Sequence, residues 1–154
     1  MLLNLVLFAT LILFAILVSQ PLFYFLALTS ASRALGAAAY IEIRHSIDAE
    51  MQKRGAVLYY STLAACILLF GIAIWHGNTV VSIAAAVTLL GLIADIVLMM
   101  KGNVPINGII NTWTPERYPA DWEQYRAKWL QIFGYRQIAL GLAFVSLLLG
   151  AVFK

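Results

Sequence analysis

Four long apolar stretches constrain the fold of this chain more than any other feature of its sequence. They cover residues 2–30, 56–75, 79–100 and 130–153. A helix needs about 20 apolar residues to cross the roughly 30 Å of bilayer hydrocarbon, and each stretch has that length. Lipid offers no hydrogen-bond partner to an open strand, and none of the four shows the alternation of a strand. The sequence therefore predicts four transmembrane helices.

The composition favours a membrane protein over a soluble domain. Hydrophobic residues make up 63% of the 154 positions, charged residues only 11%, and the mean hydropathy is +0.90. Soluble domains are nearer half apolar and a quarter charged. We expect residues 1–154 to form one membrane domain, an all-α bundle whose two interfacial amphipathic helices, at 33–54 and 103–128, cap the same side.

Basic residues predict which side of the membrane each segment faces. Four spans place residues 31–55 and 101–128 on one side, and both termini with the short turn after residue 75 on the other. Eight of the ten Lys and Arg residues lie in those two segments, whereas the other side carries only Lys154. Because basic loops stay in the cytoplasm, we expect both caps there and both termini outside, in a bacterial inner membrane. The net charge of +3 follows from this asymmetry and does not indicate nucleic-acid binding.

Two charged residues fall inside the predicted spans, Asp95 in the third and Arg136 in the fourth. Ionisable groups at membrane depth usually face the bundle interior and have a partner. Both lie about 9 Å from the cytoplasmic end of their span, so we predict a buried ion pair. Arg136 is then either structural or binds an anionic ligand while Asp95 orients it. Small residues at helical spacing, which allow close packing, accompany both charges: Ala84, Thr88 and Gly91 in one span, and Ala139, Ala143, Ser146 and Gly150 in the other.

The first cap contains a candidate metal-binding pair. Residues 37–54 are predicted to form an amphipathic helix, on which Glu42 and His45 lie three residues apart and share a face. A Glu-x-x-His pair supplies half of a carboxylate di-iron site, but the spans offer only Asp95 as a further carboxylate. We therefore expect a solvated polar face and no metal, with Glu42 and His45 as metal ligands in the alternative. The expected apolar stripe of this helix is Tyr40, Ile43, Ile47 and Met51.

The second cap opens with KGNVPINGIINTW, in which Asn103, Asn107 and Asn111 are four residues apart. Asn103 is predicted to cap a short helix that carries Pro105 in its first turn. Asn107 then lies inside that helix, near the depth of the two charges. A second helix is predicted to begin after Asp121 and to run into the last span.

These segments resemble the anthrone-oxygenase-like family of small four-span membrane proteins, most of which are known only as a domain of unknown function. The resemblance rests on GNVPIN, a following Trp, DWEQYRAKW, and an arginine seven residues after that last Trp, and it is best over residues 101–140. The chain departs from the family at Phe133 and Gly134, where relatives often have Asn or His. Carried over to this sequence, the resemblance implies a site that includes Asn103, Pro105, Asn107, Trp129 and Arg136.

The resemblance also implies a reaction. Relatives are thought to oxidise aromatic anthrones with O2 and without an obvious cofactor, so no cofactor is expected here. A base would remove an acidic C–H proton, and Arg136 with amide donors would hold the resulting oxyanion. We expect His45 to be the base, with Asp95 as the alternative. The first hypothesis is thus an oxygenase for a membrane-soluble aromatic or quinone-like molecule.

Two other functions remain open at this point: a non-catalytic carrier that binds a hydrophobic ligand, and an assembly subunit whose polar residues only join helices. The expected partners are membrane lipid and a hydrophobic small molecule, and the sequence does not predict an oligomeric state. For either ligand-binding function we expect one cavity open to the cytoplasmic interface, formed by Glu42, His45, Asn103, Asn107, Trp129 and Arg136, with Tyr24, Tyr59 and Phe133 as walls.

The orientation can be tested by cysteine labelling in a Cys66→Ala background. Lys154→Cys should react with a membrane-impermeant maleimide while the inner membrane is intact, because the C-terminus is predicted to lie outside. Arg117→Cys should react only after the inner membrane is permeabilised. The reverse pattern would show that the basic residues do not set the orientation of this chain.

Overall fold

In the computed structural model, which describes residues 1–154, all regular structure is helical. Two short π-helical segments, η1 and η2, interrupt the α-helices. The elements in chain order are α1 (Leu2–Phe23), η1 (Tyr24–Leu28), α2 (Thr29–Ala34), α3 (Ala37–Trp75), α4 (Thr79–Leu98), η2 (Met99–Asn103), α5 (Val104–Ile110) and α6 (Trp122–Val152).

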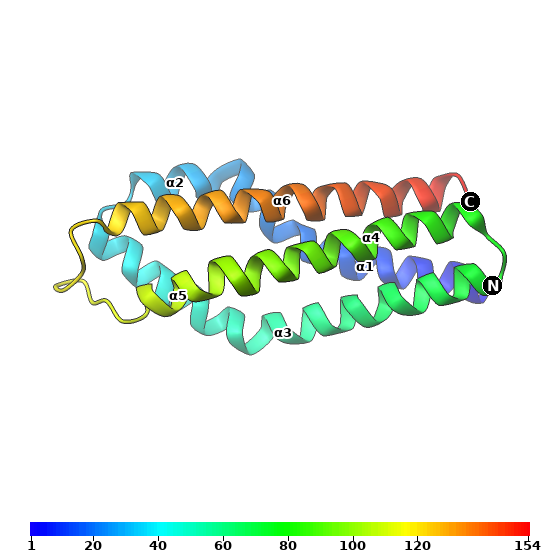
Figure 1. Cartoon of the computed structure of the whole chain (residues 1–154), viewed down its shortest axis with the longest axis horizontal. Helices are drawn as coiled ribbons and strands as arrows, with labels where there is room; N and C mark the ends of the chain where they lie inside the picture. Colours follow the sequence, from blue (N-terminus) through cyan, green and yellow to red (C-terminus); the bar gives the residue numbers. More distant parts are fainter.

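These elements form four helical rods, Leu2–Ala34, Ala37–Trp75, Thr79–Ile110 and Trp122–Val152, each long and apolar enough to cross a membrane. The predicted four-helix membrane architecture is therefore confirmed. Both termini and the turn at 76–78 lie at one end of the elongated bundle, and the turn at 35–36 and the loop at 111–121 lie at the other (Figure 1). We call the second end the polar end. The 39 residues of α3 extend about 58 Å, so this helix is longer than roughly 30 Å of hydrocarbon requires.

The first predicted cap is not a separate helix, because residues 37–54 continue without a break into the second span as α3. Its predicted apolar stripe is wrong at Ile43 and omits two charged residues that face inward. Ile43 is 44% exposed, whereas Arg44 and Asp48 are 6% and 9% exposed and face the bundle. A helix that borders lipid is stable with apolar side chains outward, and its charges then turn inward toward polar partners. Tyr40 is 2% exposed, and Ile47 and Met51 are half-buried. Hydrophobicity therefore identified the packed face in outline but not the charged residues that share it.

The π-helical segments lie next to the two helix-interior prolines. The N–H of Thr29 donates to Tyr24 and the N–H of Val104 to Met99, each five residues earlier. Pro105 has no N–H, so the α-helical ladder is interrupted there, and the extra residue of a π turn changes which residues face inward. Asn103 ends η2 with its side chain buried and makes no capping bond, which corrects its predicted role as a helix cap.

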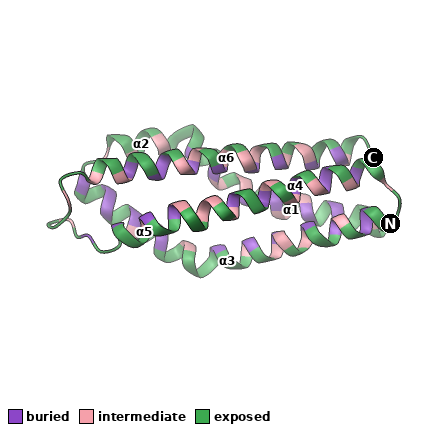
Figure 2. Cartoon of the chain, in the orientation of Figure 1, coloured by how far each residue is buried: buried purple, intermediate pink, exposed green.

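The interior contains two apolar clusters at different levels. One includes Phe14, Leu69 and Leu147 and fills the half of the bundle nearer the termini. The other includes Ile110 and Trp129 and fills the polar end. Buried residues follow the inside of the helices and exposed ones cover the outside (Figure 2). Many of the exposed residues are large and apolar, which is the surface that lipid solvates.

The two stripes of small residues pack against each other, as predicted. The Thr88 hydroxyl donates to the Ala143 carbonyl oxygen at 3.1 Å, and the Ser146 hydroxyl to that of Ala84 at 3.4 Å. A Cβ at Gly91 would lie 2.7 Å from the Ala143 Cβ and 3.0 Å from the Ala139 carbonyl oxygen. Glycine is therefore needed at position 91 for α4 and α6 to approach this closely.

Gly91→Ala should lower the free energy of unfolding in detergent micelles by about 1–3 kcal/mol, because the added methyl group overpacks the contact between α4 and α6. Gly141→Ala is the matched control, since a Cβ at Gly141 would meet nothing within 4 Å. We expect that control to be neutral or slightly stabilising, as alanine is the better helix former. Equal stability of the two variants would contradict the packing argument.

Candidate functional site

A closed hydrogen-bond network surrounds Arg136 between the two apolar clusters. Its Nε donates to Asp95 Oδ1 at 2.8 Å, and its Nη2 donates to Asp95 Oδ2 at 3.4 Å and to the Tyr59 hydroxyl at 2.9 Å. The Tyr59 hydroxyl in turn donates to Asp95 Oδ2 at 2.7 Å. The exposed fraction is 0% for the Asp95 side chain and 8% for Arg136. The buried ion pair predicted from the matched depths is therefore confirmed.

Asn103 completes this network. Its Oδ1 accepts from Arg136 Nη1 at 3.1 Å, and its Nδ2 donates to the Trp129 carbonyl oxygen at 3.0 Å. All three nitrogens of Arg136 therefore donate to acceptors within the protein. The geometry supports the structural role of Arg136 more directly than a role in binding a ligand.

A second network, closer to the polar end, is centred on Asn107. The Asn107 Oδ1 accepts from Arg44 Nη2 and from Trp129 Nε1, both at 2.8 Å, and its Nδ2 donates to Asp48 Oδ1 at 2.8 Å. Asn111 Nδ2 donates to Asp48 Oδ2 at 2.7 Å. The four-residue spacing of the asparagines thus places their amides where they bind charged groups of α3 and α6.

A cavity of about 380 Å³ lies beside the two networks. It falls within the range of roughly 300–1,000 Å³ that is usual for small-molecule sites, and most of its lining is apolar. Its polar lining comes from both networks and from further residues of α1, η1 and α3. These polar residues are Gln20, Tyr24, Arg44, Asp48, Gln52, Tyr59, Tyr60, Asn103, Asn107, Trp129 and Arg136.

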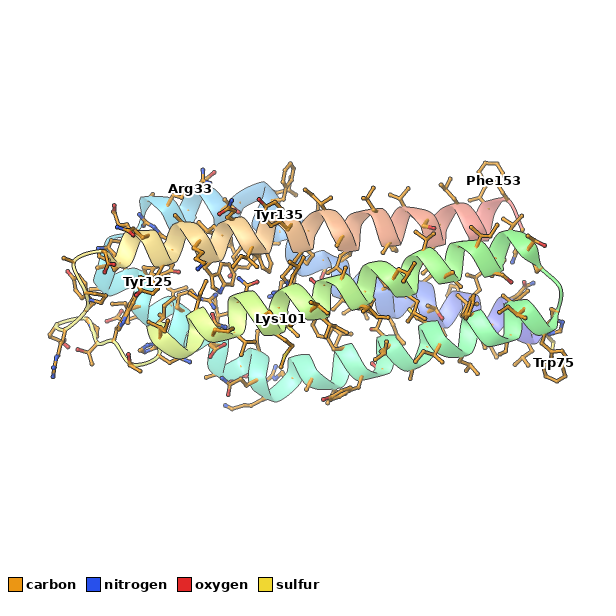
Figure 3. All side chains as sticks on the ribbon, viewed as in Figure 1. Arg33, Trp75, Lys101, Tyr125, Tyr135 and Phe153 are labelled. Carbon is orange, nitrogen blue, oxygen red and sulfur yellow. The ribbon has the colours of Figure 1, made fainter.

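The cavity opens sideways between α3 and the η2–α5 segment. The lining residues with exposed side chains are Gln52, Ala56 and Tyr60 on one side, and Met100 and Val104 on the other. Lys101, the neighbour of Met100, marks the level of this mouth in Figure 3, away from both ends of the bundle. A ligand therefore meets the mouth along the side of the bundle.

Aromatic rings form one wall. Trp129 stacks on Phe133 with their centroids 4.9 Å apart, and Tyr24 packs on both, at 5.7 Å from Trp129 and 4.5 Å from Phe133. The Arg44 guanidinium carbon lies 4.2 Å from the centroid of the Trp129 ring. The wall therefore combines flat apolar rings with a cation at its edge, an arrangement in which the ring face attracts the charge.

Five of the predicted site residues line this cavity: Tyr24, Asn103, Asn107, Trp129 and Arg136. Tyr59 and Phe133, predicted as walls, line it too. Asp95 lies directly behind Tyr59 and Arg136 and is fully buried.

Glu42 and His45 lie outside the cavity, so the predicted convergence of six residues is wrong for these two. Glu42 is exposed, and His45 Nε2 lies 3.0 Å from the Ile110 carbonyl oxygen. Consecutive residues of a helix point about 100° apart, and on α3 it is Arg44 that faces the cavity. His45 is therefore not positioned as a base for a bound ligand. The alternative metal site has no third ligand, because no group of three His, Cys, Asp or Glu side chains comes together.

Sequence reasoning missed Arg44 and Asp48, and it assigned Tyr59 only an apolar role. A signal was present, since residues 44, 48, 55 and 59 recur at helical spacing along α3 and all line the cavity. Tyr40, Ile47 and Met51 of the predicted apolar stripe share this side of α3, and an apolar stripe gave no reason to expect charged residues beside it.

Comparisons of the chain with protein-family models, with curated proteins and with solved structures found no match. The resemblance to the anthrone-oxygenase-like family stays a prediction. The function is therefore argued from the geometry of the cavity and its lining residues.

Arg136→Met and Asp95→Leu should each lower the free energy of unfolding by about 3–5 kcal/mol, because each leaves a buried charge without its partner. The double variant should be far more stable than the sum of the single effects implies, since no charge is then stranded. Arg54→Met is the control at an exposed pair with Glu50, where the expected loss is at most about 1 kcal/mol. Additive single effects would show that the two buried charges do not stabilise each other.

Proposed function

We propose that this chain is a membrane protein that binds a hydrophobic small molecule in the cavity beside its two hydrogen-bond networks. The supporting observation is the cavity itself: aromatic and aliphatic walls enclose a few fixed polar groups, which is the usual make-up of a ligand site. The two networks hold these polar groups in place before any ligand arrives.

The side opening suggests how the ligand enters. Large apolar side chains are exposed near the mouth, with Val57 71%, Tyr60 73% and Val97 45% exposed, beside the polar Gln52 and Lys101. A hydrophobic molecule concentrates in lipid because its transfer from water is favourable. It would then pass from the bilayer between α3 and η2 without crossing water. With the orientation predicted from the basic residues, this mouth lies near the cytoplasmic surface of the inner membrane.

A cofactor-independent oxygenase is the second candidate, and the observation that favours it is a carboxylate in the cavity lining. Asp48 replaces His45 as the candidate base, since it lines the cavity and His45 does not. The base would take a proton from an acidic CH2 group of an aromatic ketone. The carbanion would add to O2, and loss of water would leave a carbonyl group, so that CH2 and O2 give C=O and H2O. Arg44 would stabilise the intermediate oxyanion.

Binding can be tested by closing the mouth. The probes share one methylated ring: durene without polar groups, duroquinone with two carbonyl groups, and tetramethylbenzoate with a carboxylate. At least one should bind the full chain in lipid nanodiscs, measured by equilibrium dialysis against empty nanodiscs. Ala56→Trp should weaken that binding at least tenfold, because the indole fills the mouth.

Ala94→Trp is the matched control, an exposed alanine of α4 that does not line the cavity, and it should bind as the unmodified chain does. If none of the three probes binds, or if both variants bind equally well, the proposed function is wrong.

Oxygen separates the two candidates. An oxygenase should consume O2 and convert an anthrone to its dione faster than the spontaneous reaction, and Asp48→Asn should remove that excess rate while the protein stays folded. A binder should retain the anthrone and yield no product above the spontaneous rate. Anaerobic incubation, in which both must be inactive, gives the baseline.

A further inference from the structure

Exposed charges show where the bilayer hydrocarbon ends along the bundle. Counted from the end that holds both termini, the first exposed charged residues of three rods are Arg54, Lys101 and Lys128. At about 1.5 Å per residue they lie about 32, 33 and 36 Å along their rods, and the hydrocarbon is about 30 Å thick. The hydrocarbon therefore ends near the level of Lys101, which Figure 3 shows far from Trp75 and Phe153 at the end with the termini.

The cavity crosses this level. Its lining on α3 extends from Arg44 to Leu63. Arg44 lies about 15 Å beyond Arg54 on the side of the polar end, and Leu63 about 14 Å from Arg54 on the hydrocarbon side. A volume of about 380 Å³ spread over this length is narrow. The cavity therefore has a shape that suits an extended chain.

The character of the lining changes at the same level. On the hydrocarbon side most of the lining is apolar, as at Leu63, Ile96 and Met99, and the polar atoms of Tyr59 and Arg136 are bonded within the ion-pair network. On the other side the polar lining residues are Arg44, Asp48, Gln52, Asn103, Asn107 and, at the level itself, Tyr24 and Trp129. A ligand with an apolar chain and a polar head matches both halves of the cavity.

The mouth of the cavity crosses this level as well. On α3 it extends from Tyr60, about 9 Å from Arg54 on the hydrocarbon side, to Gln52, about 3 Å from Arg54 on the other side. On the opposite side it is bordered by Met100 and Val104, which flank Lys101 in the chain. A lipid can therefore enter sideways with its chain and its head each at the depth they have in the bilayer, while a second chain stays outside.

The exposed charges near the mouth are mostly positive. Lys53 and Arg54, which follow Gln52 in the chain, share Glu50 as their ion-pair partner, at 3.1 and 3.5 Å. Lys101 is exposed and takes part in none of the four ion pairs of the structure. Basic side chains at the membrane surface attract anionic headgroups. A phosphate at this level would therefore be favoured.

We infer that the cavity takes up one hydrocarbon chain of a membrane lipid whose head bears a phosphate. The chain extends toward Leu63, and the phosphate lies at the mouth between Gln52 and Lys101. Inside the cavity the charges of Arg44 and Asp48 balance, so the positive excess lies at the mouth. This inference rests on the proposed function and names the class and the orientation of the ligand.

Photolabelling tests the orientation. Two isomers of lysophosphatidate are used, one with a diazirine at the end of the acyl chain and one with the diazirine beside the glycerol. With the full chain in lipid nanodiscs, the first isomer should label Leu63 and Ile96, and the second should label Gln52 and Val104, as mapped by mass spectrometry. An excess of unlabelled lysophosphatidate should suppress both patterns.

The mouth variant separates the cavity from the lipid-facing surface. Ala56→Trp should remove the labelling of all four cavity residues, because the indole fills the mouth. Leu90 is 66% exposed and does not line the cavity, so the chain-end isomer should label it equally in both proteins. Loss of labelling at Leu90 as well would show that the variant is misfolded, and the patterns of the unmodified chain then decide.

Competition tests the head. Lysophosphatidate should suppress cavity labelling at about fivefold lower concentration than monoacylglycerol of the same chain, the effect of one nearby cation on an anionic head. Inorganic phosphate, which has no chain, should not compete. Lys101→Gln should remove most of the fivefold difference. Lys128→Gln is the matched control, an exposed lysine near the same level on α6 that does not line the cavity, and should preserve it.

Four results would overturn the inference. The same labelling pattern from both isomers would show that the chain has no fixed orientation. Equal competition by monoacylglycerol would show that the phosphate is not recognised, and competition by inorganic phosphate would identify a site for the free anion. In these three cases the proposed function stands if Ala56→Trp removes the labelling. The fourth is the absence of cavity labelling by either isomer, and binding of durene or its derivatives then decides the proposed function separately.

Discussion

The ion pair between Arg136 and Asp95 is the interaction on which the rest of the polar end depends. Neither charge can be solvated by lipid, so both must be satisfied by protein atoms. The partners come from three different rods: Tyr59 from α3, Asp95 and Asn103 from the α4–η2 segment, and Arg136 from α6. The network therefore fixes the relative positions of these rods at one level, where the apolar core that includes Leu92 and Leu140 ends.

Because the ion-pair network holds the helices in place, a cavity can form beside it. Beyond it the helices no longer pack on a continuous apolar core, and Asn107 joins α5 to α3 and α6 through amide hydrogen bonds. These bonds orient Arg44 and Trp129 while the space beside them stays open. Polar groups that are already held in place are suited to binding, because few side chains lose conformational freedom when a ligand binds. The π-helical turn that ends at Asn103 places its amide at the junction of the cavity and the ion-pair network.

Much of the fold and part of the site could be predicted from the sequence. The four spans follow from the length of the apolar runs, and the Asp95–Arg136 pair follows from the cost of a charge at membrane depth. The small residues that accompany each charge correctly predicted which faces of α4 and α6 meet. Asn103, Asn107 and Trp129 were placed correctly as cavity residues by resemblance and by depth.

The sequence by itself determined that this chain is a four-helix membrane bundle with a buried ion pair, because hydrophobic length and buried charge are local properties. Only the tertiary structure decided that Arg44 and Asp48, and not Glu42 and His45, face the cavity. These four residues lie within two turns of one helix, and the apolar residues of that helix do not show which of its charged groups turn inward. The choice depends on Asn107, Asn111 and Trp129, whose contacts with Arg44 and Asp48 join residues 59 to 85 positions apart in the chain. In a helix that borders lipid, apolar residues are stable facing outward, so the position of the polar partners determines which face turns inward.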